Sequence, residues 1–263
     1  MSVTENINIL SDFCGKRDIE ELTKECLHSK YGISRVDVMV LFGGSILCGG
    51  DVLASAIKND VAKKYIIVGG AGHTTQTLRD KMHEKCPDIV TEGLSEAEIF
   101  NNYLQYKYSL KADFIETRST NCGNNITFLL DLLKDKGIDC NSIILSQDAT
   151  MQHRMEAGLR KYRPDMTVIN YATYKVKVRD VEGKLSYDSD VWGMWNIDRY
   201  ITLLMGEIPR LSDDENGYGP KGKNFISHVD VPQGVIEAFE ELKKIYGGFV
   251  REANPEFASV SEE

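Results

Sequence analysis

Short apolar runs alternate with amphipathic segments along residues 36–170. The runs are rich in β-branched residues, as in the strands of a buried parallel sheet, and the segments between them repeat apolar residues at the spacing of one helix face. Strands are therefore expected at 36–42, 65–68, 112–116, 142–146 and 166–170, with helices between them. This alternation predicts the α/β class, with a doubly wound, mainly parallel sheet and helices on both faces.

The two ends of the chain differ from this middle part. Residues 1–34 carry a helical pattern broken near Gly15, and we expect them to form a helical cover over the sheet. Residues 35–180 contain all the expected strands and form the ligand-binding core. From residue 181 to residue 263 we expect a smaller, mostly helical extension that packs on the core.

The extension contains two further helical patterns. The first covers 196–205, and Gly206 and Pro209 are expected to mark its end. The second covers 230–246. Acidic residues at 213–215 are typical of a solvated turn, so we expect no metal site.

Composition and charge exclude several classes of protein. The net charge is −9 and no dense run of Lys and Arg occurs, which argues against a nucleic-acid partner. The six cysteines include no CxxC pair, which argues against a zinc site or a disulfide framework. Neither a secretory signal nor a membrane-spanning stretch is present, so we expect a cytoplasmic protein without a membrane partner. A homo-oligomer is left open.

Two consecutive strands end in glycine-rich loops. The first loop begins with Gly43, Gly44 and Ser45, and the second contains Gly69, Gly70, Gly72, His73 and Thr74. Loops at the carboxyl ends of neighbouring parallel strands meet in one crevice, where bare backbone and a helix N-terminus suit a polar or anionic ligand group. Tight turns and close helix packing also require glycine, so a purely structural role stays open.

Polar side chains crowd the loop that follows the strand at 112–116. It contains Ser119, Thr120, Asn121 and Asn125. A helix needs only one such residue as its N-cap. The polar residues beyond this single N-cap favour contacts with a ligand.

The loop and helix after the strand at 142–146 carry four further candidates, Gln147, Asp148, Met151 and Arg154. Asp148 is placed as the N-cap of a helix over 149–162. Arg154 has the planar guanidinium that pairs with a carboxylate or phosphate, although a solvated surface arginine is the simpler interpretation.

Glu96 is the acidic candidate. Ser95 and Glu98 form the sequence pattern of a capping box, which accounts for Glu98 but not for Glu96. A first-turn glutamate is also favoured by the helix dipole, and this alternative stays open.

Several familiar chemistries lack their motifs. The segment from Gly70 to Thr75 fails the dinucleotide pattern at its third glycine, and the expected ribose-binding carboxylate is missing. Neither GxxxxGK[ST], GxSxG nor HExxH occurs. An ordinary dehydrogenase, a P-loop NTPase, an α/β-hydrolase and a zinc protease are therefore excluded.

Taken together, these residues resemble the bacterial SanA/ElyC/YdcF family, and its YdcF-like members most closely. In the core the resemblance rests on Gly69-Gly70, Gly72-His73-Thr74, Glu96-Ala97, Ser119-Thr120-Asn121-Cys122-Gly123 with Asn125, Gln147-Asp148, Thr150-Met151-Gln152 and Arg154. In the tail it rests on Arg199-Tyr200, Gly206-Glu207, Pro209-Arg210-Leu211, Asp213-Asp214, Gly217-Tyr218-Gly219-Pro220 and His228-Val229-Asp230. It covers roughly residues 35 to 246.

The resemblance implies a Rossmann-like core with a smaller C-terminal part and an association with S-adenosylmethionine, without an established reaction. Asn124, Ala149 and His153 depart from the expected Glu, Pro and Arg. SanA and ElyC are membrane-anchored, and the N-terminal stretch here has no such anchor, so a cytoplasmic location remains the expectation.

We therefore expect a nucleotide-like small molecule, most specifically S-adenosylmethionine as a cofactor, to bind in a crevice formed by the loops named above. Glu96 and His73 are the catalytic candidates if the protein is an enzyme, which the sequence leaves undecided. An alternative is a phosphoryl-transfer or pyrophosphate-cleaving enzyme acting on a nucleotide- or lipid-linked diphosphate, with Arg154 stabilising charge. A third hypothesis is a scaffold whose glycine loops only pack.

Overall fold

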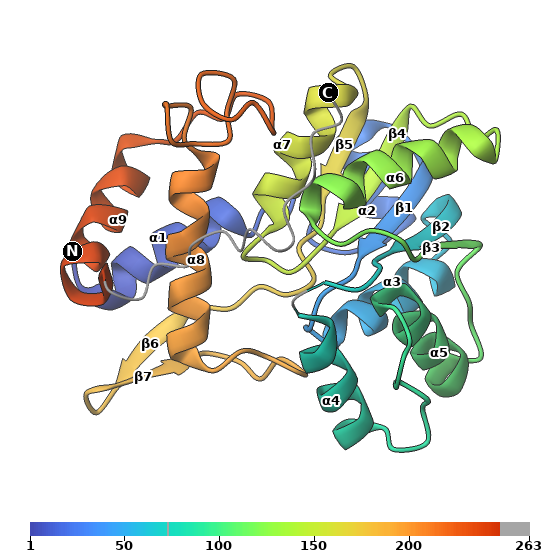
Figure 1. The fold of residues 1–263 in the computed structure, drawn as a ribbon, viewed down its shortest axis with the longest axis horizontal. Coiled ribbons are helices and arrows are strands. Elements are labelled where there is room, and N and C mark those ends of the chain that lie inside the picture. The colour runs from blue at the N-terminus through green and yellow to red at the C-terminus, as the bar shows by residue number, and fades with distance from the viewer. Residues whose placement is uncertain (73, 248–263) are drawn as a thin grey trace.

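The computed structural model of the chain describes residues 1–72 and 74–247. Its main sheet contains β1 (Val36–Phe42), β2 (Ala62–Val68), β3 (Phe114–Glu116), β4 (Ser142–Ser146) and β5 (Thr167–Asn170). The strand order is β3-β2-β1-β4-β5, and every neighbouring pair is parallel (Figure 1). The predicted Rossmann-like α/β class is confirmed.

Helices cover both faces of the sheet because successive strand residues point to opposite sides. The helices of the core are α2 (Lys24–Tyr31), α3 (Cys48–Lys58), α4 (Thr75–Lys85), α5 (Glu96–Tyr108), α6 (Cys122–Asp135) and α7 (Gln152–Tyr162). Met39 and Leu41 of β1 pack with residues of α2 to α5, whereas Val38 and Val40 pack with α6 and α7. The sheet is therefore buried on both sides, which explains its continuous apolar runs.

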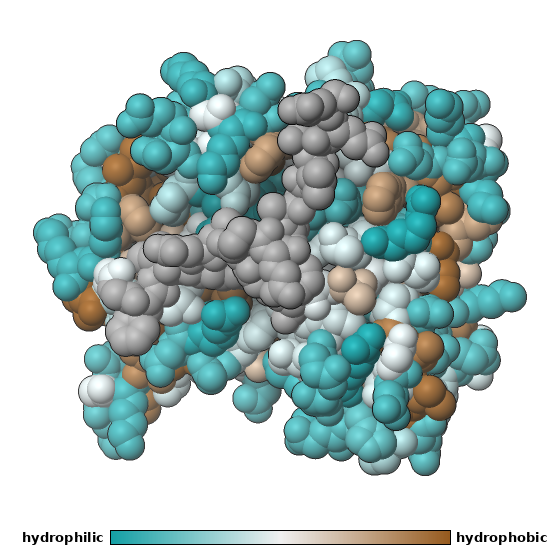
Figure 2. Space-filling model, in the orientation of Figure 1, coloured by the Kyte–Doolittle hydropathy of each residue, from teal (hydrophilic) through white to brown (hydrophobic). Residues whose placement is uncertain are grey.

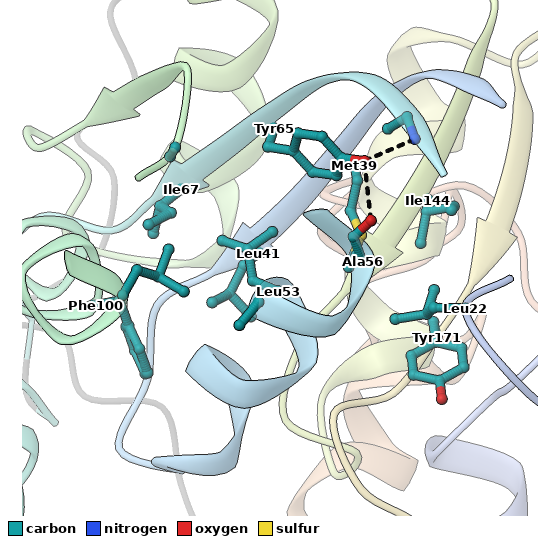
Figure 3. Packing of buried hydrophobic residues seen from close by; sticks show 14 of the residues in the cluster. Leu22, Met39, Leu41, Leu53, Ala56, Tyr65, Ile67, Phe100, Ile144 and Tyr171 are labelled. Atoms are coloured by element: carbon teal, nitrogen blue, oxygen red, sulfur yellow. Dashed lines mark hydrogen bonds between the residues drawn. The ribbon is translucent and has the colours of Figure 1, made fainter. Parts of the chain in front are cut away.

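Figure 3 shows the first of these two packed layers. Leu41, Leu53 and Phe100 meet there with at most 1% of their surface exposed, and burial of such a side chain contributes about 1.5–3 kcal/mol. The Tyr65 hydroxyl donates to the carbonyl of Ala56 at 3.0 Å and accepts from the Ala62 amide at 3.1 Å. These two bonds fix the end of α3 against the start of β2.

A smaller lobe lies beside the core and contains α1 (Val3–Cys14), the hairpin of β6 (Val178–Val181) and β7 (Lys184–Tyr187), α8 (Ile197–Leu211) and α9 (Gln233–Tyr246) (Figure 1). Ile7 and Leu10 of α1 share one apolar cluster with Tyr200 and Ile201 of α8. The helical cover expected from residues 1–34 is therefore divided. Only α2 packs on the sheet, through Leu27, and α1 packs against α8 and α9.

Several helix boundaries differ from expectation, including the start of α9, which is Gln233 rather than residue 230. The first tail helix does not end at Gly206, because α8 continues through Pro209 to Leu211. Ile208 and Leu211 are buried on either side of the proline, and this packing outweighs the cost of a proline inside a helix, about 3 kcal/mol. The helix expected to begin at Ala149 begins instead at Gln152.

The described surface is mostly hydrophilic on the face shown in Figure 2, with hydrophobic residues in scattered groups. Within residues 1–72 and 74–247, no helix combines the length and the apolar character needed to cross a bilayer.

Candidate functional site

The centre of the carboxyl edge lies between β1 and β4. The chain leaves β1 toward α3 on one face of the sheet and leaves β4 toward α7 on the other, so the two loops diverge and open a crevice. Gln147 crosses this crevice. Its side-chain Nε2 donates to the carbonyl of Gly43 at 3.1 Å, and its Oε1 accepts from the Asp148 amide at 2.7 Å. Gln147 therefore joins the two predicted loops.

Two buried hydroxyl groups near this crevice have no hydrogen-bond partner among the described residues. They are Ser45 Oγ and Thr173 Oγ1, on side chains that are 1% and 5% exposed. The third such atom, Asn6 Oδ1, lies on α1. A buried polar group without a partner costs about 1–3 kcal/mol, so most buried groups are paired. Ser45 follows β1 and Thr173 follows β5, and Thr173 lines the same small cavity as the two neighbours of Ser45. These two exceptions mark the region as a candidate ligand site.

A small cavity lies between these loops. Its volume is about 10 Å³, room for roughly one water molecule. Thr173 lines it, and so do the two residues on either side of Ser45. The full lining is Leu41, Phe42, Gly44, Ile46, Gly49, Phe100, Gln147, Asp148 and Thr173.

The sequence predicts that Asp148 is the N-cap of α7, and this prediction is wrong. Met151 precedes that helix, and no side chain caps it. The Asp148 carboxylate instead accepts hydrogen bonds from the Thr150 amide and hydroxyl, from the Tyr174 hydroxyl at 2.7 Å and from the Trp195 indole Nε1 at 2.7 Å. Donors from three separate segments hold the carboxylate in place, with three of the four bonds on Oδ1 and one, from Trp195, on Oδ2.

The donor Trp195 belongs to a segment of the smaller lobe, residues 191–195, that reaches across to the core. The Lys81 ammonium donates to the carbonyl of Gly193 at 3.0 Å and lies 4.6 Å from the centre of the Trp195 ring. The Trp192 carbonyl accepts a hydrogen bond from the Cys48 amide at 3.2 Å. The centre of the Trp192 ring lies 5.1 Å from that of the Tyr103 ring. This segment, which contains both tryptophans of the chain, therefore lies beside the crevice.

Sequence reasoning missed this segment. It has neither helical nor strand periodicity, and its contacts are with residues far away in the chain. The available signal was VWGMW itself, where two large aromatic residues interrupt a polar stretch.

Most of the predicted glycines have a packing role. A Cβ on Gly43 would lie 2.5 Å from Glu96 Oε2, and one on Gly69 would lie 3.0 Å from Glu96 Cβ. On Gly70 it would overlap the Ser119 carbonyl, and on Gly72 it would lie 2.9 Å from the Thr120 carbonyl oxygen. These glycines let β2, β3 and α5 approach closely, which is the purely structural role that the sequence left open for them.

Gly44 is favoured by its backbone conformation rather than by packing, because its φ of +158° is one that residues with a side chain rarely adopt. The nearest atom to an added Cβ is Gln147 Oε1, at 3.5 Å. Space is therefore available at Gly44, on the side of the crevice.

Glu96 lies under the glycine loops, with 7% of its surface exposed. Its Oε1 accepts from the hydroxyls of Thr74 at 3.2 Å and Thr75 at 2.9 Å. Burial raises the pKa of this carboxyl group, and the two threonine bonds oppose that shift. Thr75 was not among the predicted residues. His73, the other catalytic candidate, lies outside the described residues.

Glu96→Gln is expected to stabilise the folded protein relative to wild type, by an amount that grows as the pH rises above 4.5, the usual pKa of this carboxyl group. A raised folded-state pKa means that the folded state retains the proton after the unfolded state has lost it, so wild-type stability falls with rising pH across that window. Glutamine keeps an acceptor for both threonines without the buried charge.

Urea unfolding of both proteins between pH 4 and pH 8 would check this prediction. Glu98→Gln is the matched control, because hydrogen bonds from Ser95 lower the pKa of Glu98 and the difference there should favour wild type at higher pH. A stability difference for Glu96→Gln that does not change with pH would contradict the expectation.

The polar loop after β3 is held largely by its own contacts. Ser119 Oγ accepts from the Gly70 amide at 3.0 Å, and Asn121 caps α6 by accepting from the Asn124 amide at 2.9 Å. Thr120 donates to the Asn124 side chain at 3.1 Å, and Asn125 is 8% exposed in the first turn of α6. Ser119, Thr120 and Asn121 thus have structural partners.

Arg154 is neither solvated nor directed toward the crevice loops in this structure. Its guanidinium forms two hydrogen bonds to Glu207 of α8, at 2.5 and 2.9 Å, and the two side chains are only 11% and 2% exposed. This ion pair joins α7 of the core to the smaller lobe.

The structure therefore divides the predicted residues into groups. Gly43, Gly69, Gly70, Thr74, Glu96 and Ser119 lie in contact under the β2 loop. Gly44, Gln147 and Asp148 line the crevice between β1 and β4, with Ser45 between two of the lining residues. Arg154 is held by α8, and Met151 precedes α7. No group of three His, Cys, Asp or Glu residues able to hold a metal occurs in the part of the chain that the structure describes.

When the chain is compared with known protein families, no family model matches it. Membership of the SanA/ElyC/YdcF family, to which its motifs point, stays a prediction.

Proposed function

We propose that this protein binds a nucleotide-like small molecule, S-adenosylmethionine in particular, in the crevice between the loops that follow β1 and β4. The observation that carries the proposal is the pair of buried hydroxyls without partners, Ser45 Oγ and Thr173 Oγ1. They lie where open α/β sheets bind their ligands. A ribose or adenine group presents the hydrogen-bonding atoms that these hydroxyls lack.

An adenosyl group is larger than a cavity of about 10 Å³. Binding must therefore move part of the surroundings, and we expect the Trp195 side chain to move. Its contact with the Asp148 carboxylate is a single hydrogen bond, whereas Trp192 and Gly193 of the same segment are bonded to the core. Displacement of the Trp195 ring would free Asp148 Oδ2 for a ligand hydroxyl.

The alternative of a phosphoryl-transfer or pyrophosphate-cleaving enzyme has less support. It requires Arg154 beside the ligand, whereas Arg154 pairs with Glu207. It also requires an accessible base, whereas Glu96 is buried beneath two threonine hydroxyls. Phosphate release from a panel of nucleotides and sugar diphosphates, with Glu96→Gln as the control, distinguishes this enzyme from a binding protein.

Calorimetric titration of ligand-stripped protein with S-adenosylmethionine and with S-adenosylhomocysteine tests the proposal. We expect saturable heat from both, since both carry the adenosyl group. No heat from either compound at millimolar concentration would reject it.

Thr173→Val should have two opposite effects. Valine keeps the shape of threonine and removes a buried hydroxyl without a partner, so the ligand-free protein is expected to gain about 1 kcal/mol in stability. The same change removes a ligand contact, so the affinity for S-adenosylmethionine should fall about tenfold. Thermal unfolding and calorimetry measure the two effects.

Ser146→Ala is the matched control for stability, because the Ser146 hydroxyl donates to the Tyr171 carbonyl at 2.7 Å. This variant should lose stability. If Thr173→Val also lost stability and kept full affinity, its hydroxyl would be an ordinary structural group and the argument for the site would fail.

A further inference from the structure

A second, larger hollow lies at the seam between the core and the smaller lobe, with a volume of about 320 Å³. His153, Glu156 and Arg160 line it from one face of α7, at positions i, i+3 and i+7. The segment at 227–230, which leads to α9, also lines it, together with Lys16 and Ala157. None of these residues belongs to the crevice between β1 and β4.

The wall formed by α7 and Lys16 carries an excess of positive charge. Lys16 and Arg160 both pair with the one carboxylate of Glu156, whose side chain is 6% exposed. Two cations and one anion leave one positive charge. His153 adds none at neutral pH, because burial and the nearby Lys16 lower the pKa of its ring.

The segment at 227–230 contributes one carboxylate to the hollow, that of Asp230. His228 Nδ1 lies 2.6 Å from a carboxylate oxygen of Asp213, and its Nε2 lies 2.9 Å from one of Asp230. Hydrogen bonds to Asp230 and Asp213 raise the pKa of His228. Asp213 lies outside the lining and balances the charge of a protonated His228, so Asp230, whose side chain is 99% exposed, remains the negative group at this rim of the hollow.

Across the residues at 1–72 and 74–247, no ion pair joins the segment at 227–230 to α7 or to Lys16. Their separation is set by the backbone, since the Ser227 amide and hydroxyl both bond to the carbonyl of Ala157 at 3.0 Å. Groups of opposite charge thus line one hollow without forming an ion pair with each other.

We propose that this hollow binds a small zwitterion of the α-amino-acid type, with its carboxylate against Lys16 and Arg160 and its ammonium group against Asp230. Guanidinium and carboxylate form the stronger, charge-assisted kind of hydrogen bond, and a hollow lined by groups of opposite charge selects a ligand that carries both signs. The volume lies at the lower end of the range for small-molecule sites, about 300–1,000 Å³.

The test is calorimetric titration of the full chain with glycine, L-serine and L-valine. N-acetylglycine and glycinamide are the matched probes, because each lacks one of the two charges. At least one zwitterion is expected to bind about tenfold more tightly than glycinamide, which lacks the carboxylate, as the loss of one charged hydrogen bond predicts. It should bind about twofold more tightly than N-acetylglycine, which lacks the ammonium group opposite the exposed Asp230.

Arg160→Met should weaken zwitterion binding about tenfold, and Asp230→Asn, which removes a 99% exposed carboxylate, about twofold. Both side chains are exposed enough to change without unfolding the chain. Arg179→Met removes the same charge from the exposed hairpin and should have no effect. Ser45→Ala, which alters the crevice between β1 and β4, should also leave it unchanged. The proposal is overturned if no zwitterion binds, if N-acetylglycine binds as tightly as glycine, or if Arg160→Met has no effect.

Discussion

Replacement of Glu207 by leucine is expected to destabilise the folded chain by about 3–5 kcal/mol, because it leaves the Arg154 guanidinium buried without its partner. The Arg154 and Glu207 side chains are 11% and 2% exposed, so water cannot replace the lost carboxylate. The loss is a large part of the stability of a typical protein, about 5–15 kcal/mol. Urea unfolding followed by circular dichroism measures it.

Two further variants show whether the uncompensated charge is the cause. Adding Arg154→Leu to Glu207→Leu should recover most of the lost stability, since two apolar side chains can replace a buried ion pair at little cost. Asp12→Asn removes the partner of Lys177 in an exposed pair, and it should change stability by no more than about 0.5 kcal/mol. If the double variant were as unstable as Glu207→Leu, the loss would come from packing rather than from charge.

Gly70→Ala should have the second-largest effect, a loss of about 3 kcal/mol. The added Cβ would overlap the carbonyl oxygen of Ser119 and lie 2.7 Å from that of Thr117, and backbone atoms cannot rotate away as side chains do. Because Gly70 joins the β2 loop to the β3 loop, thermal unfolding should reveal the change without any ligand.

Gly234→Ala is the control for this prediction. Nothing lies within 4 Å of a Cβ added there, and alanine favours the first turn of α9, so stability should rise by about 0.5–1 kcal/mol. If Gly70→Ala left stability unchanged but abolished ligand binding, the packing account of the β2 loop would be wrong and the original ligand role of this glycine would be restored.

The core of the fold could be predicted because its signal is local. Most residues of β1, β2 and β4 lie in a sheet buried on both faces, so each of these strands contributes an apolar run to the sequence. The edge strand β3 is shorter and partly exposed. The placement of α1 could not be predicted in this way. Its apolar face is equally suited to the sheet or to another helix, and only the contacts with α8 and α9 decide between them.

The position of the candidate loops could be predicted from the sequence, whereas the contacts of their side chains could not. The polar and glycine-rich loops do follow the strands, but the loops alone could not distinguish a ligand contact from a packing contact. Arg154 shows the reason, since its partner Glu207 lies 53 positions away on a different lobe. Thr173 and Trp195 were missed for the same reason, because their importance depends on contacts made only in the folded chain.

A crystal structure of the protein grown with S-adenosylmethionine is the most direct test of ligand binding in the crevice. The proposal predicts the adenosyl group between the loops that follow β1 and β4, with an adenosyl oxygen or nitrogen within about 3.2 Å of Ser45 Oγ or Thr173 Oγ1, and with Trp195 moved away from Asp148. Adenosyl density elsewhere on the protein, or none at saturating ligand, would contradict it.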